Sequence, residues 1–135
     1  MRRGLTKTGA VALGALVLAL SGCGRDGDRQ NVRAVVDGFY AAVRDHHGAR
    51  ACALLSPDTR KALEQQESES CDKALDKLHL DGGRTDRVQV FSTEASVELL
   101  GGDTVFLGDT PNGWQISAAG CQPQGDKPAD CEVQD

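Results

Sequence analysis

The first half of the chain has the hydrophobic spacing of amphipathic helices. Between residues 31 and 45, apolar residues recur at steps of three and four, which places them on one face of a helix. The stripe comprises Val32, Val35, Val36, Phe39, Tyr40 and Val43. A short second helix is predicted over residues 49–55, so the first half of the protein is predicted to be helical.

Two further helices are predicted from their starting residues. Ser56 and Pro57 mark the start of one that runs to about residue 66, because serine caps helices and proline suits their first turn. Ser68 or Ser70 can cap the next one. Its inner face comprises Cys71, Leu75 and Leu78.

Beyond residue 83 the apolar period changes to two, as is typical of strands with one buried face. The alternating residues are Val88, Val90, Ala95, Val97, Leu99, Val105, Leu107, Trp114, Ile116 and Ala118. Turn-forming residues at 101–103 and 109–113 have hairpin spacing, so we predict three or four antiparallel strands. Residues 122–130, with their Pro, Gly and Asp, are predicted to be a loop. Helices followed by an antiparallel sheet indicate an α+β fold.

The first 22 residues have the pattern of a secretory signal peptide. Arg2, Arg3 and Lys7 precede an uncharged apolar run over residues 9–20, and a basic start followed by such a run is typical of export signals. The run is shorter than the roughly 20 residues that an uncleaved transmembrane helix needs. The paired arginines also resemble a loose twin-arginine signal, so the export route stays open.

Cys23 ends the run Leu20-Ser21-Gly22-Cys23, which resembles the lipobox of bacterial lipoproteins. The resemblance implies that residues 1–22 are cleaved and that a diacylglyceryl group is attached to the Cys23 thiol. The protein would then be anchored in the cell membrane, on its extracytoplasmic face. An ordinary signal peptide with a cysteine by chance is the alternative.

The segment after the lipobox divides into two parts. Residues 23–30 are predicted to be the lipidated cysteine and a short polar tether, in which residues 24–30 reach about 23 Å when extended at roughly 3.3 Å per residue. Residues 31–135 are predicted to form one domain, because the mature chain is too short for two separate cores. The folded part is therefore expected close to the membrane.

The charge balance limits the possible partners. The whole chain has 15 basic and 20 acidic residues, and three of the basic ones precede Cys23, so the mature chain has a net charge of −8. Nucleic acid is not expected as a partner, because its phosphates favour clustered lysine and arginine. The domain also has no polybasic patch for anionic lipid, so membrane attachment is assigned to the lipid on Cys23.

Four cysteines remain if Cys23 carries a lipid, an even number in an exported chain. Three pairings are possible. We favour Cys52–Cys71 and Cys121–Cys131, because each pair lies within one local unit and closes a short loop. Free buried thiols are the alternative. Paired Cys-x-x-Cys steps are absent from the sequence, so no metal site is expected.

Several segments also resemble small lipoproteins of high-GC Gram-positive bacteria. They are Phe39-Tyr40, residues 51–57, residues 113–116 and residues 118–121. The fold of these lipoproteins is similar to the nuclear transport factor 2-like, or SnoaL-like, superfamily. That resemblance implies helices packed on a bent antiparallel sheet, which forms a cone with a pocket at its open end. The predicted sheet has few strands, so the cone would be truncated.

Enzymes of that superfamily usually place an Asp, His or Tyr deep in the cone as acid or base. The resemblance therefore makes Tyr40, Asp45 and His46 weak catalytic candidates, although a helix C-terminus accounts equally well for a histidine. Tyr40 and Trp114 are candidates for lining a pocket, and each also suits a core. The sequence contains no phosphate-binding loop or nucleophile elbow, so no cofactor is expected.

Three functions remain open from the sequence. The first is a non-enzymatic, lipid-anchored module that binds a cell-envelope protein or a small apolar ligand at the cell surface. The second is a SnoaL-like enzyme, of isomerase or hydrolase type, that uses a pocket acid or base. The third is a structural component of the envelope.

Overall fold

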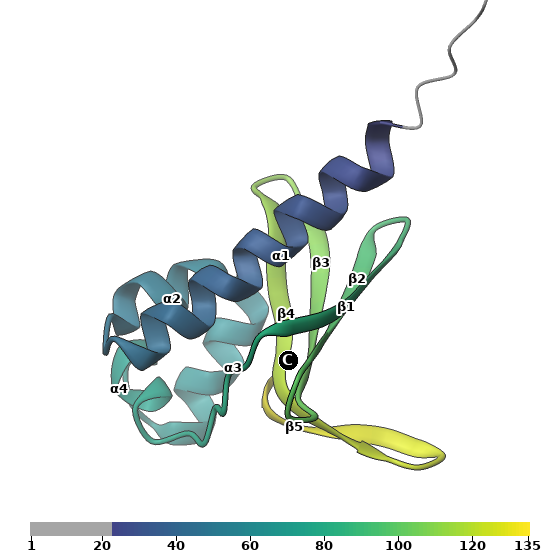
Figure 1. The fold of residues 1–135 in the computed structure, drawn as a ribbon. Helices are drawn as coiled ribbons and strands as arrows, with labels where there is room; N and C mark the ends of the chain where they lie inside the picture. Colours follow the sequence, from purple (N-terminus) through teal and green to yellow (C-terminus); the bar gives the residue numbers. More distant parts are fainter. Residues whose placement is uncertain (1–22) are drawn as a thin grey trace, which may run out of the picture.

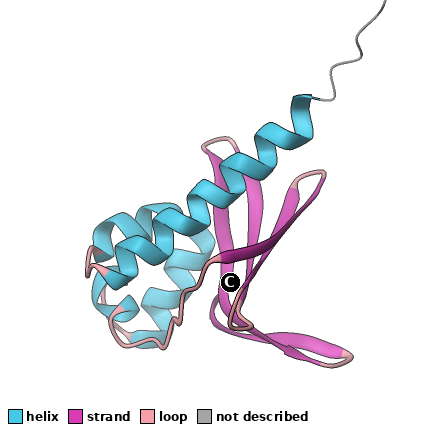
Figure 2. Cartoon of the chain, in the orientation of Figure 1, coloured by secondary structure: helices cyan, strands magenta, loops and turns pink. Residues whose placement is uncertain are grey.

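The computed structural model describes residues 23–135, in which four helices precede five strands (Figures 1 and 2). The strands form one antiparallel sheet in the order β1-β2-β3-β4-β5, so each strand pairs with its neighbours in sequence. This confirms the predicted α+β class. The predicted signal peptide lies outside the described residues. The elements are α1 (Cys23–Arg44), α2 (Gly48–Leu54), α3 (Pro57–Glu67), α4 (Cys71–Leu75), β1 (Thr85–Phe91), β2 (Glu94–Leu99), β3 (Thr104–Thr110), β4 (Gly113–Gln124) and β5 (Lys127–Gln134).

Helix α1 begins eight residues earlier than predicted. Residues 24–30, predicted to be a tether, continue the helix from Cys23, so that prediction was wrong. Gly24 and Gly27 suggested a flexible segment, but Asp26 lies in the first turn, where an acidic group is favourable. Asp26 also pairs with Arg29 at 3.2 Å, one turn along. Cys23 therefore starts a helical extension of about 12 Å at 1.5 Å per residue.

The sheet also has more strands than predicted. Residues 122–130 were predicted to be a loop, but most of them belong to a hairpin of β4 and β5, and only the turn at Gly125 and Asp126 lies between the strands. This hairpin turns away from the rest of the sheet (Figure 1). Gly120 has a φ of +65°, a conformation that glycine adopts readily. A Cβ there would lie 2.9 Å from Leu80 Cδ2, so a side chain would also be too crowded.

The core lies between α1 and the sheet. Val32, Val36 and Phe39 of α1 are at most 1% exposed. They belong to one cluster with the inward-facing residues of the strands. The fully buried members from β2, β3 and β4 include Val97, Val105, Leu107, Ile116 and Ala119. The period-two pattern thus identified the buried face of these strands correctly.

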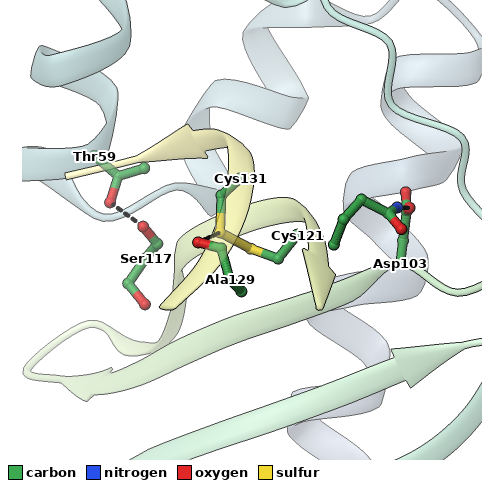
Figure 3. Close-up of a disulfide and its surroundings, with 7 residues drawn as sticks. Thr59, Asp103, Ser117, Cys121, Ala129 and Cys131 are labelled. Carbon is green, nitrogen blue, oxygen red and sulfur yellow. Dashed lines mark hydrogen bonds between the residues drawn. A yellow bond between two sulfur atoms is a disulfide. The ribbon is translucent and has the colours of Figure 1, made fainter. Parts of the chain in front are cut away.

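The start of α3 joins the helices to the sheet. Ser56 Oγ accepts a hydrogen bond from the backbone N–H of Thr59 at 3.2 Å, which confirms the predicted cap. The backbone N–H of Ser56 donates to the carbonyl of Ile116 at 2.8 Å. The hydroxyl of Thr59 donates to the carbonyl of Ser117 at 3.0 Å (Figure 3). Strand β4 is therefore held by the α3 start as well as by its neighbouring strands.

Both disulfides have the pairing favoured from the sequence. Cys52 of α2 is bonded to Cys71, the first residue of α4. Cys121 of β4 is bonded to Cys131 of β5, its direct partner in the strand register (Figure 3). Helix α4 begins after Ser70 but ends at Leu75, so it is shorter than the predicted helix that reached Leu78. The Cys52–Cys71 disulfide thus links two helices, and the Cys121–Cys131 disulfide links the two strands of the last hairpin.

Candidate functional site

A groove runs between α1 and α2 and ends at the turn between β3 and β4. It consists of two hollows of about 630 and 450 Å³ that share the side chains of Ala34, Val35, Ala53 and Leu54. Because these four residues line both hollows, we treat the hollows as one continuous groove. Its further lining residues are Asn31, Gly38, Arg50, Asn112, Gly113, Trp114 and Gln115.

The spacing along α1 explains how the groove forms. Asn31, Ala34, Val35 and Gly38 follow one another at three- and four-residue steps, so they form a second stripe beside the buried one. Val35, which was expected in the core, is half-buried in this second stripe. Small side chains here leave space between the two helices.

Gly38 illustrates how shallow the floor of the groove is. A Cβ added at Gly38 would lie 3.6 Å from Leu54 Cδ1, which is ordinary van der Waals contact. A methyl group would therefore fit without strain and would fill part of the groove. The glycine is not required by the backbone, since its φ is in the normal helical range.

The groove is mostly uncharged although the chain is acidic. Among its described lining residues, Arg50 is the one charged side chain. The polar residues at the other end, Asn31, Asn112 and Gln115, are neutral. Gln115 is held in place because its side-chain amide donates to the carbonyl of Leu55 at 3.4 Å. The groove thus suits an apolar occupant, and Arg50 favours one that carries an anionic group.

Trp114 and Tyr40, the two predicted pocket residues, do not share a pocket. Trp114 lines the groove and is 8% exposed. Tyr40 lines a separate hollow of about 600 Å³ between α1 and the segment that leads to β1. Its ring packs on Gly82, where a Cβ would lie only 2.5 Å from Tyr40 Cδ1. The remaining lining residues of that hollow are Asp37, Ala41, Val43, Arg44, Leu80, Asp81, Gly83 and Arg84.

The phenol of Tyr40 is poorly suited to act as a base. The side chain is 8% exposed, and its Oη is buried and has no hydrogen-bond partner among the described residues. Burial raises the pKa of Tyr40 to about 12, with smaller contributions from the charges of Asp103 and Asp81, while the backbone of Gly120 acts in the opposite direction. The phenol therefore keeps its proton at neutral pH.

The other two catalytic candidates lie on the surface, and neither of them lines the Tyr40 hollow. His46 Nδ1 is 3.5 Å from Asp76 Oδ1, and both side chains are more than half exposed. Asp45 Oδ1 accepts a hydrogen bond from Arg44 Nε at 3.0 Å, which lowers the pKa of Asp45. His46 lines another hollow, whose lining does not include Tyr40 or Asp45. The three candidates are therefore not brought together in one site.

Asp103 is a buried carboxylate that was not singled out from the sequence. It is 7% exposed and accepts a hydrogen bond from the side-chain amide of Gln122 (Figure 3). Burial raises the pKa of Asp103, and the nearby charges of Asp81 and Glu132 raise it further. This burial could not be predicted from the local pattern, because Gly101-Gly102-Asp103 is an ordinary turn sequence.

Comparison of the chain with protein-family models, with curated proteins and with solved structures finds no match. Within residues 23–135, no cluster of three or more His, Cys, Asp or Glu residues is arranged to hold a metal ion. None of the described helices combines the length and apolar character needed to cross a bilayer.

Proposed function

We propose that this protein is a lipid-anchored, extracytoplasmic binding module that holds an apolar ligand, or an apolar part of a cell-envelope protein, in the groove between α1 and α2. The observation that carries the proposal is the groove itself, with Val35, Leu54 and Trp114 among its lining residues. Apolar clefts with a few polar groups are where proteins commonly bind small ligands. The lipobox-like run before Cys23 supports anchoring at the outer face of the membrane.

The resemblance to SnoaL-like lipoproteins is part of this proposal. It is supported by the order of four helices before an antiparallel sheet whose last hairpin turns away from the rest. The binding groove proposed here differs from the pocket of a cone, because it lies between two helices. We therefore place the function on the groove and not on Tyr40.

The groove is tested by site-specific photocrosslinking in intact cells. A photoreactive amino acid at Ala53, which lines the groove, should capture a defined protein or lipid. The same group at Ala49, an exposed residue of α2 outside the groove, should not capture it. Equal capture from both positions would contradict a groove-specific occupant.

A blocking substitution makes the test sharper. Ala53→Arg places a long charged side chain in the groove and should abolish capture by a photoreactive group at Ala34 on the facing helix. Ala49→Arg adds the same charge to the same helix and should leave capture unchanged. Capture that survives Ala53→Arg would overturn the proposed site. Loss of the occupant in the Cys23→Ala protein would show that it is met at the membrane.

A further inference from the structure

Three features gather at one end of the molecule: the start of α1, the turn between β1 and β2, and the turn between β3 and β4 (Figure 1). The backbone N–H of Asp109, in β3 two residues before the β3–β4 turn, donates to the carbonyl of Thr93 in the β1–β2 turn at 2.8 Å. Asn31 of α1 and Asn112 of the β3–β4 turn line the same hollow. The turn between β2 and β3 lies at the opposite end of the sheet (Figure 1).

The β1–β2 turn carries an exposed aromatic ring. Phe91, the last residue of β1, is 60% exposed, more than Leu100 at 47% or Phe106 at 37%. Removing an apolar side chain of this size from water is favourable. Burial of the Phe91 ring in an apolar environment is therefore favourable.

The start of α1 has a net charge of +1 over residues 24–33, whereas the rest of the domain is acidic. Because α1 is helical from Cys23, Arg25, Arg29 and Arg33 follow one another at steps of four, and all three are exposed on one side of the helix. Residues 24–33 hold three arginines and two aspartates, whereas residues 34–135 hold nine basic and eighteen acidic residues. A negatively charged surface thus attracts the α1 start and repels the rest of the domain.

Other charges limit the strength of that attraction. Arg29 pairs with Asp26 at 3.2 Å. Glu94 and Asp109, near the two turns, are exposed and acidic. The charge asymmetry therefore sets the direction in which the domain points, and Phe91 adds an apolar contact to the attachment that the lipid on Cys23 supplies.

We propose that this end of the domain docks onto the lipid bilayer, with the ring of Phe91 inserted among the headgroups. The proposal rests on the lipid anchor at Cys23 proposed above. A continuous helix, in place of a flexible tether, holds the α1 start and the two turns toward the surface that carries the anchor. Docking also places the Asn31–Asn112 end of the groove beside the headgroups, where an apolar occupant can enter from the membrane.

The test compares tryptophan probes at the two ends of the sheet. The full lipidated protein, purified from membranes, is reconstituted into phosphatidylglycerol vesicles that contain brominated lipid, a short-range quencher of indole fluorescence. Phe91→Trp probes the proposed docking end. Leu100→Trp is the matched control, an exposed apolar residue at the opposite end. Both are made with Trp114→Phe, which removes the one natural tryptophan.

We expect several-fold stronger quenching for Phe91→Trp than for Leu100→Trp, and a smaller difference in neutral phosphatidylcholine vesicles. Equal quenching of the two probes would overturn docking. If Trp114→Phe prevents folding, a photoreactive phenylalanine analogue at residue 91 or residue 100 replaces the probes, and docking requires lipid adducts from residue 91 alone.

Flotation of the parent protein and the Cys23→Ala variant with membranes distinguishes the two proposals. If the parent protein floats and the Cys23→Ala variant does not, this result supports the anchor. The probes then test docking alone. A parent that does not float contradicts the anchor, and the docking proposal falls with it.

Discussion

The pair of short helices α2 and α4 and the hairpin of β4 and β5 are each closed by one disulfide, yet they depend on it differently. Helices α2 and α4 have seven and five residues. Such short helices are unstable in isolation, and their backbone hydrogen bonds do not link one helix to the other. Strands β4 and β5 are already joined by an antiparallel ladder that includes the pair Cys121 and Cys131. The first disulfide is therefore a principal tether, and the second reinforces an existing one.

The largest effect is expected from removing the helical disulfide. The Cys52→Ala, Cys71→Ala double variant should lose about 3 kcal/mol of unfolding free energy, because the bond closes a loop with a separation of 19 residues in the unfolded chain. Urea unfolding measures the loss. Native-state hydrogen exchange should show faster exchange in α4 than in the strands. Unchanged protection of α4 would contradict its role as the principal tether.

Removal of the second disulfide should cost slightly less. The separation of 10 residues between Cys121 and Cys131 corresponds to about 2.7 kcal/mol in the same chain-entropy description. Hydrogen exchange of the Cys121→Ala, Cys131→Ala variant should show that the β4–β5 ladder stays protected. Fast exchange in this hairpin after loss of its disulfide, together with unchanged exchange in α4 after loss of the Cys52–Cys71 bond, would contradict the comparison.

The joint between the two halves is tested at Thr59. Thr59→Val keeps the shape of this fully buried side chain but removes its hydrogen bond to the carbonyl of Ser117. A buried carbonyl left without its donor costs roughly 1–3 kcal/mol, and Ser117 is only half-buried, so we expect about 1 kcal/mol in urea unfolding. Thr59→Ser keeps the hydroxyl and serves as the control. A loss in Thr59→Ser as large as that in Thr59→Val would assign the effect to packing.

The smallest effect at neutral pH is expected from Tyr40, whose ring packs on Gly82 in the segment that leads to β1. Its pKa of about 12 in the folded protein exceeds the ordinary value of 10.0. The unfolded chain therefore loses this proton first, and the stability contribution is complete below pH 10 and is lost as the pH rises toward 12. Ultraviolet absorbance follows this single tyrosine directly. A midpoint near 10 in the folded protein would contradict its burial.

The sequence predicted the parts of the fold that local patterns determine. The capping sequence at Ser56 and the period-two strands around Val97 identified their elements correctly. The extension of α1 was missed because two glycines in residues 24–30 resemble a linker. The second half of the last hairpin was missed because Pro123 and Pro128 weaken a strand pattern. The first segment is helical through its own charged residues, Asp26 and Arg29, whereas the last hairpin depends on the pairing of β5 with β4.

The candidate site was harder to predict. Trp114 lines the groove, but the groove depends on how α1 and α2 approach each other, with Gly38 facing Leu54. A sequence period identifies the buried stripe of a helix, and it does not show how closely a second helix packs beside that stripe. Tyr40 lies within α1, whereas Asp45 and His46 follow the end of this helix at Arg44. Their separation likewise depends on where the helix ends.

The most direct test of a lipid-anchored binding module is the intact mass of the mature protein extracted from membranes, followed by sequencing of its first peptide. Our account predicts a chain that begins at Cys23 and carries a lipid on that residue. A chain that begins at an unmodified Cys23, or one that retains the residues before it, would contradict the anchor and the surface location that follows from it.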